Sequence, residues 1–132
     1  MLHGSCLCNS ITYTLSGELR DARFCHCRKC RKFSGSAAGA WAIAEASQLS
    51  VQKQAVPVTR YDSGRGIRCF CSKCGSPVWF ESVDHPETLV IPLGALDSDN
   101  IEAPGMHIYA ASRPAWSKIP DGLPAFDTYP QP

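Results

Sequence analysis

Residues 69–75 read Cys-Phe-Cys-Ser-Lys-Cys-Gly (CFCSKCG), and this stretch carries the strongest structural signal in the chain. Cys71 and Cys74 flank two residues and are followed by Gly75. This is the spacing of a zinc knuckle, in which two thiolates hold one ion through a tight turn and a glycine relaxes the exit of the turn. Two ligands leave a tetrahedral zinc ion half coordinated. We therefore expect a second pair of ligands from elsewhere in the chain.

Cys6 and Cys8, near the N-terminus, are the candidates for the missing pair. Residues i and i+2 of an extended strand point to the same face, so both thiols can chelate one ion, while Leu7 would point the other way, toward packing. The resulting site is a closed, structural zinc site with four thiolate ligands: Cys6, Cys8, Cys71 and Cys74. Buried free cysteines and disulfides are the alternatives at these spacings.

Residues 24–30 read Phe-Cys-His-Cys-Arg-Lys-Cys (FCHCRKC) and hold a second group of thiols. If residues 23–27 are extended, Cys25 and Cys27 share a face, and one helical turn returns Cys30 to that face. Three thiolates can bind one ion and leave its fourth position open. An open position is typical of a catalytic zinc rather than a structural one.

Two residues are candidates for that fourth position. His26 points away from the shared face by the same geometry, which favours a supporting or surface role over that of a ligand. Cys69 lies two residues before Cys71 and could supply a fourth thiolate to either ion, which would make the second site another closed one. Cys69 is equally compatible with a small apolar strand residue.

Short strands are predicted for most of the remaining chain. Ile11–Leu15 alternates apolar and polar side chains with the period of a half-buried strand. Similar runs between turn residues predict strands at 40–44, 49–53, 58–61, 67–70, 78–81, 89–93 and 107–109. Helical turns are expected at residues 27–33 and 45–49. The segment 111–132 holds five prolines, so we expect it to wrap irregularly, with Trp116 and Phe126 as apolar anchors.

Composition excludes several classes of protein. With 132 residues and 44% hydrophobic content, residues 1–132 suit a single domain with an adequate core. The formal net charge of +1 offers no global attraction for nucleic acid or anionic membranes. Because the N-terminus lacks a signal-peptide pattern, we expect a soluble, cytoplasmic protein. In that reducing compartment the eight cysteines indicate metal binding rather than disulfides.

Several motifs together resemble the glutathione-dependent formaldehyde-activating enzyme family, also called the GFA or CENP-V domain family. The resemblance spans nearly the whole chain and rests on Gly-Ser-Cys-Leu-Cys at 4–8, Cys-His-Cys-x-x-Cys at 25–30, Phe-Cys-x-x-Cys-Gly at 70–75, His107, Trp116 and Asp-Gly-Leu-Pro at 121–124. It implies an Mss4-like fold of several coiled antiparallel β-sheets with short helical turns. It also implies two zinc ions per chain, one structural and one catalytic, at the two cysteine groups already described.

The resemblance implies an activity as well: joining glutathione to formaldehyde to give S-(hydroxymethyl)glutathione, a carbon–sulfur lyase reaction. The second cysteine group suits this chemistry, because a zinc ion with an open position binds a thiol as thiolate and lowers its pKa from about 8.5. Three cysteinates give the centre a net charge of −1, which favours handling sulfur over generating hydroxide. The expected partner is a small thiol such as glutathione.

Four basic residues surround the second cysteine group: Arg28, Lys29, Arg31 and Lys32. Arg28 and Lys29 lie inside the Cys-x-x-Cys turn and are the candidates for binding the carboxylates of an anionic thiol. The alternative is a solvated face that offsets the negative metal centre. Two other functions stay open for the whole chain: a non-catalytic, zinc-stapled interaction module of Mss4-like type, and a zinc-ribbon nucleic-acid binder, against which the near-neutral charge argues.

Overall fold

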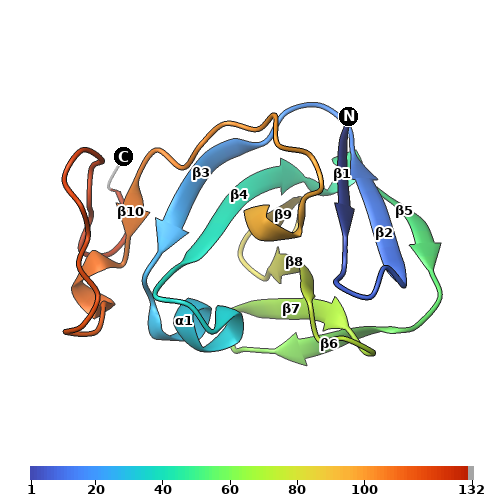
Figure 1. The fold of residues 1–132 in the computed structure, drawn as a ribbon, viewed down its shortest axis with the longest axis horizontal. Coiled ribbons are helices and arrows are strands. Elements are labelled where there is room, and N and C mark those ends of the chain that lie inside the picture. The colour runs from blue at the N-terminus through green and yellow to red at the C-terminus, as the bar shows by residue number, and fades with distance from the viewer. Residues whose placement is uncertain (131–132) are drawn as a thin grey trace.

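The structure, a computed structural model that describes residues 1–130, is built from two β-sheets (Figure 1). The smaller sheet has the strand order β1 (Leu2–Ser5), β2 (Ile11–Leu15) and β5 (Leu49–Gln54). The larger sheet has seven strands in the order β10 (His107–Ile108), β3 (Arg20–Cys25), β4 (Gly39–Glu45), β9 (Thr88–Pro92), β8 (Pro77–Ser82), β7 (Gly66–Cys71) and β6 (Val58–Asp62). Neighbouring strands are antiparallel except β10 and β3, which are parallel. The expected mainly β fold class is therefore confirmed.

The main hydrophobic core joins the two sheets. The alternation of β2 places Ile11, Tyr13 and Leu15 at 0–1% exposure, where they pack with residues of β4, β7, β8 and β9. Tyr13 meets Trp79 edge to face at 5.8 Å between ring centroids, and its hydroxyl donates to the carbonyl of Val78 at 3.1 Å. A buried tyrosine with its hydroxyl satisfied in this way stabilises contact between the sheets.

A second, smaller core lies beside the one α-helix of residues 1–130, α1 (Arg28–Ser34). It contains Cys25, Cys30, Trp41 and Ile108. Cys27 is the N-cap of α1, and Gly35 ends the helix with a left-handed φ of 67°, a conformation that glycine adopts without strain. At seven residues α1 is too short to be stable alone, so its position depends on this core.

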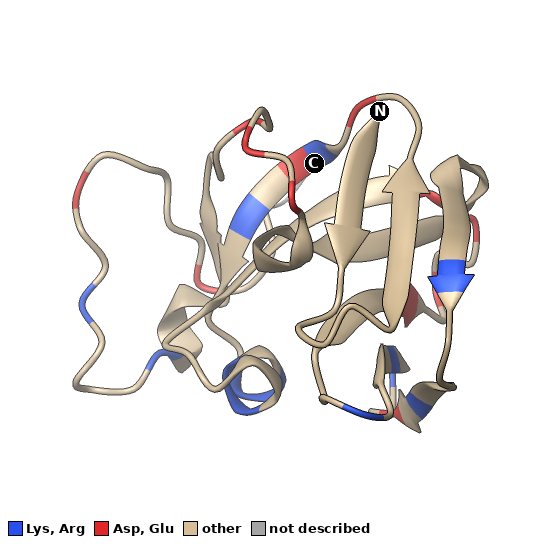
Figure 2. Cartoon of the chain, turned by 45° about the vertical axis from the view of Figure 1, so that its right-hand side comes forward, with Lys and Arg blue, Asp and Glu red and all other residues tan. Residues whose placement is uncertain are grey.

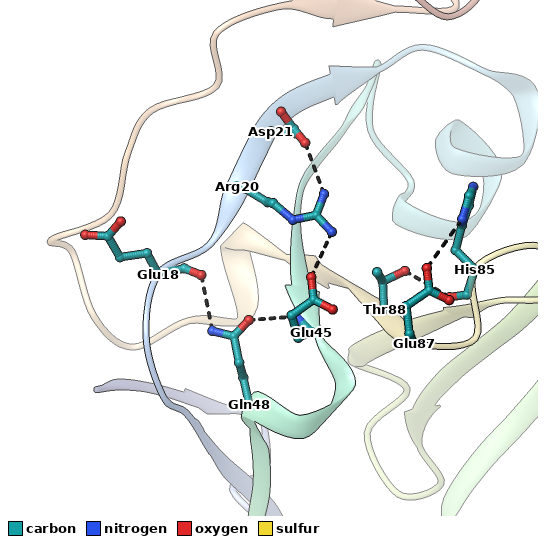
Figure 3. A network of polar contacts seen from close by, with 8 residues as sticks. All are labelled: Glu18, Arg20, Asp21, Glu45, Gln48, His85, Glu87 and Thr88. Atoms are coloured by element: carbon teal, nitrogen blue, oxygen red, sulfur yellow. Dashed lines mark hydrogen bonds and ion pairs between the residues drawn. The ribbon is translucent and has the colours of Figure 1, made fainter.

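Polar contacts tie the far end of β4 to its neighbours (Figure 3). Glu45 accepts from Arg20 at 2.9 Å, and the Gln48 side chain accepts from the Glu45 backbone at 2.6 Å while donating to the carbonyls of Ser16 and Glu18. Gln48 belongs to the 3₁₀ turn η1 (Ala46–Gln48), which leads from the large sheet into β5 of the small one. The network therefore holds the crossover between the sheets.

After β10 the chain, through residue 130, is irregular apart from the short turn η3 (Ala110–Ser112), as its prolines predicted. His107 bonds to this tail on both sides, donating to Pro124 and accepting from Phe126 at 2.9 Å each. Trp116 is 71% exposed, so its predicted role as an apolar anchor is wrong. Phe126 is half-buried, and residues 131–132 of the predicted segment lie outside the described residues.

The predicted strands match eight of the observed ones with small boundary differences. Leu93 starts the turn η2 (Leu93–Ala95) instead of ending β9, and Tyr109 leaves β10 with a left-handed φ of 53°. β1 and β3 were not predicted as strands. None of the helices in residues 1–130 combines the length and apolar composition that crossing a bilayer needs.

Candidate metal centres

Four cysteine thiols meet where the two sheets join. Cys6 and Cys8 lie just after β1, Cys71 ends β7, and Cys74 lies in the turn before β8. All four sulfur atoms are within 4.8 Å of one another, with 3.6 Å between Cys6 and Cys8 and 3.8 Å between Cys8 and Cys71. Tetrahedral zinc with bonds of about 2.3 Å needs sulfur atoms about 3.8 Å apart. The four residues therefore fit a closed zinc site.

Two serine hydroxyls contact sulfur atoms of this group and favour their thiolate form. Ser10 Oγ lies 3.2 Å from Cys8 Sγ, and Ser76 Oγ lies 3.3 Å from Cys74 Sγ. Because each hydroxyl can donate to a thiolate, the pKa of Cys8 is lowered and that of Cys74 falls to about 5. Ser76 also accepts from the Leu7 backbone at 2.9 Å, which links the two halves of the site.

The way in which Cys6 and Cys8 converge differs from the predicted one. They lie in the turn between β1 and β2, not in an extended strand, and the turn is closed by Asn9, which donates to the Cys6 carbonyl at 3.0 Å with a φ of 61°. Leu7 is consequently 87% exposed rather than packed. The structure brings the predicted pair together with Cys71 and Cys74, whereas the local geometry assigned to the pair was wrong.

The second group of thiols forms where β3 passes into α1. Cys25 ends β3, Cys27 has an extended backbone with φ −64° and ψ 154°, and Cys30 lies in the first turn of α1. The three sulfur atoms lie within 4.8 Å of one another, and Cys27 Sγ accepts from the Cys30 backbone at 3.4 Å. The predicted strand-then-turn geometry of this group is what the structure has. The donor set fits one zinc ion with three protein ligands.

The three thiols have different tendencies to ionise. Hydrogen bonds with the Cys25 and Cys30 side chains hold the pKa of Cys27 well below its usual value, and backbone N–H groups at the start of α1 add to this. The pKa of Cys25 is raised, because it makes hydrogen bonds to Cys27 and Cys30 and is buried. Negative charge therefore gathers first on Cys27, which is also the least buried of the three.

Cys69 joins neither group of sulfur atoms. It faces the main core opposite Trp79, whereas its strand neighbours Arg68 and Phe70 face the other side, toward Phe33 of α1. Alternation along β7 thus puts the sheet between Cys69 and the three-cysteine group. Burial raises the pKa of Cys69 to about 11. Cys69 is thus a fully buried core residue whose sulfur lies 3.8 Å from both Arg60 Nη1 and Glu81 Oε1, and it belongs to neither sulfur group.

A buried pair of histidines lies beside the three-cysteine group. His26 and His107 are 4% and 6% exposed, with 2.8 Å between His26 Nε2 and His107 Nδ1. Burial lowers the pKa of both, so the pair is neutral near pH 7. His26 points away from the sulfur atoms, as predicted, but it is not at the surface. No sequence pattern predicted this pair, because the parallel pairing of β10 with β3 brings the two histidines together.

The basic residues of α1 differ in their exposure and in their contacts. Figure 2 shows this helix as a basic segment, and its sequence has no acidic residue. Arg31 donates to the carbonyls of His26 and Ser112 at 3.3 Å each, so it fixes the helix. Arg28 and Lys29 are exposed, and Lys29 donates to the Ser63 carbonyl at 2.6 Å. Their predicted contact with substrate stays a prediction.

The fold and the two sites define a mainly β protein with two cysteine groups suited to zinc. The family model described as "Glutathione-dependent formaldehyde-activating enzyme" (GFA) matches residues 1–112. This chain therefore belongs to the GFA family. A protein of Halomonas elongata named "Putative glutathione-dependent formaldehyde-activating enzyme" is 28% identical over 127 residues, covering 90% of this chain and 81% of that protein. A crystal structure of a Rhodobacter sphaeroides protein superposes with a TM-score of 0.62 and 27% identity, covering 74% of this chain and 90% of that one.

Proposed function

We propose that the chain is a zinc-dependent carbon–sulfur lyase of the S-(hydroxymethyl)glutathione synthase type, acting on glutathione and formaldehyde or a related pair of thiol and electrophile. The family name and the named relative support a thiol and an aldehyde as reactants. The observation that carries the proposal is the three-cysteine group of Cys25, Cys27 and Cys30, to which Cys69 adds no fourth sulfur. This donor set leaves room for a substrate thiol.

The reaction needs no redox partner. The S–H group of the thiol adds across the C=O bond of the aldehyde, so a carbon–sulfur bond forms, the π bond breaks, and a proton moves from sulfur to oxygen. A zinc ion at the three cysteines would supply a site where a thiol loses its proton near neutral pH. Because all three protein ligands are soft thiolates, the site suits sulfur better than hydroxide.

The chain's own residues hold this site in shape. The backbone N–H of His26 donates to Ile108 of β10 at 3.0 Å, and its carbonyl accepts from Arg31 of α1 at 3.3 Å. Cys25 and Cys27 flank His26 and are thereby fixed relative to both elements. Arg28 and Lys29, exposed at the start of α1, are proposed to attract an anionic thiol. The four-cysteine group has a structural role in this proposal.

The proposal is tested with the zinc-loaded protein, glutathione and formaldehyde. We expect the wild type to accelerate formation of S-(hydroxymethyl)glutathione, measured by exchange NMR at equilibrium. Cys27→Ser should reduce this acceleration by at least about 100-fold, because the metal loses a ligand, while Cys69→Ala should retain it. A protein of the interaction-module type would leave the spontaneous rate unchanged for every thiol and aldehyde pair, and that result would overturn the proposal.

A further inference from the structure

Arg68 is a mostly buried arginine whose guanidinium has no acceptor among residues 1–130. It is 7% exposed, yet no hydrogen bond or ion pair joins its side chain to any other residue of 1–130. Three other arginines have carboxylate partners and three donate to backbone carbonyls: Arg20, Arg60 and Arg65, and Arg23, Arg31 and Arg113. Arg28 is exposed to solvent. The fully buried side-chain nitrogen and oxygen atoms that lack a partner within residues 1–130 are His26 Nδ1 and Trp41 Nε1, so the nitrogens of Arg68 still reach solvent and are open to an anion.

Two aromatic rings hold the Arg68 guanidinium in place. Its central carbon lies 5.2 Å from the ring centroid of Phe33 and 5.0 Å from that of Phe80. Phe80 is the cross-strand partner of Arg68, and its ring leans over Gly66, where a Cβ would come within 2.2 Å of it. Rings over a guanidinium stabilise its charge, but they accept no hydrogen bond in its plane. The N–H groups stay available for a planar anion.

Arg68 also faces the three-cysteine group rather than the main core. Phe33, which it contacts, is three residues after Cys30 on α1. Phe33 in turn packs against the small core that contains Cys25 and Cys30. The Phe33 ring therefore connects the Arg68 guanidinium to the three-cysteine group, on the same side of the sheet.

We propose that Arg68 binds the carboxylate of a thiol acid whose sulfur occupies the three-cysteine site. This inference rests on the proposed function and narrows its substrate class to thiols that carry a carboxylate. A guanidinium donates two parallel N–H···O bonds to a carboxylate, and this charge-assisted pairing is stronger than a neutral hydrogen bond. Arg68 acts as a specificity-determining residue, while Arg28 and Lys29 contribute attraction from the surface.

The test compares two small thiols on the zinc-loaded protein by isothermal titration calorimetry. The probes are 3-mercaptopropionate, which carries a carboxylate, and 2-mercaptoethanol, which is neutral. For Arg68→Gln we expect affinity for 3-mercaptopropionate to fall by about 10- to 100-fold, the usual range for a hydrogen bond to a charged group, with affinity for 2-mercaptoethanol unchanged. Arg65→Gln, which removes an exposed arginine from the neighbouring turn, is the matched control and should change neither.

Each other result has a distinct meaning. If Arg68→Gln loses affinity equally for both thiols, Arg68 is a counter-ion of the thiolate cluster. If it loses affinity for neither, Arg68 is a packing residue. Both results overturn the inference and leave the proposed function standing. A wild type that binds neither thiol would overturn both. If Arg68→Gln fails to bind zinc or no longer has the circular dichroism spectrum of the folded protein, Arg68→Lys replaces it, because lysine keeps the charge but not the paired donors. A loss of affinity confined to 3-mercaptopropionate then supports the inference, and wild-type affinity for both thiols overturns it.

Discussion

Single positions on β7 decide which thiols can bind metal. Cys69 and Cys71 both point to the main core. Only Cys71, two residues further along β7, belongs to the four-cysteine group. Arg68, the residue before Cys69, faces the opposite side of the sheet, toward α1. Sequence spacing alone does not show whether Cys69 is a metal ligand. The answer depends on which face of the sheet each cysteine group occupies.

Replacing Cys69 therefore tests the division of the eight thiols. We expect Cys69→Ala to bind as much zinc as the wild type, two ions per chain, because its sulfur belongs to neither group. Cys27→Ser should lose one ion. Metal analysis of both purified variants after gel filtration makes the comparison, with circular dichroism as the check on folding. Loss of a zinc ion from Cys69→Ala would mean that Cys69 is a ligand after all.

At the scale of elements, the strands that could be predicted are those in which apolar and polar side chains alternate. β2 places Ile11, Tyr13 and Leu15 in the core, and this period of two is legible without any partner. β1 and β3 lack it. β1 contains Gly4, which is required because a Cβ there would lie 2.3 Å from the Tyr13 ring, and β3 begins with charged residues and a register shift. These strands exist because their neighbours pair with them, which local sequence does not encode.

The helix α1 shows the same dependence on its surroundings. Its seven residues are too few for independent stability, and its N-cap is Cys27, a member of the three-cysteine group. In the zinc-loaded wild type we expect its backbone to be held by metal ligands at both Cys27 and Cys30. Removing the ion should therefore loosen the helix before the sheets.

Cys25→Ser tests this coupling without changing the sequence of α1. We expect the amides of Arg28–Ser34 to exchange with deuterium faster in this variant than in the zinc-loaded wild type, because the weakened metal site no longer fixes the first turn. Amides of β2, in the main core, should exchange at unchanged rates. Mass spectrometry of peptic peptides resolves the two regions. Equal protection of α1 in both proteins would show that packing alone holds it.

At the scale of the whole molecule, the sequence predicted which cysteines meet, although they lie about half the chain apart. Thiolate spacing is specific because zinc accepts few geometries. The surroundings of the site were much less predictable. The contact between His26 and His107 requires the parallel pairing of β10 with β3, and the isolation of Arg68 requires knowing which residues fail to meet it. Both are properties of the assembled sheets rather than of any local pattern.

The four-cysteine group joins the turn after β1, in the small sheet, to the turn after β7, in the large one. A structural zinc in such a place contributes directly to folding, by about 10–16 kcal/mol in zinc-finger peptides. That range is comparable to the whole stability of a domain, about 5–15 kcal/mol. Loss of the ion should accordingly unfold the protein or lower its melting temperature by tens of degrees.

Cys74→Ser and Cys27→Ser form a matched pair for this prediction, because both thiols are half-buried and each belongs to one of the two groups. We expect Cys74→Ser to be largely unfolded, or to melt far below the wild type, since the sheets lose their link. Cys27→Ser should melt within a few degrees of the wild type, since its group supports one short helix. Differential scanning calorimetry at equal zinc concentration compares them. The opposite order of melting temperatures would assign the structural role to the three-cysteine group and remove the basis for placing chemistry there.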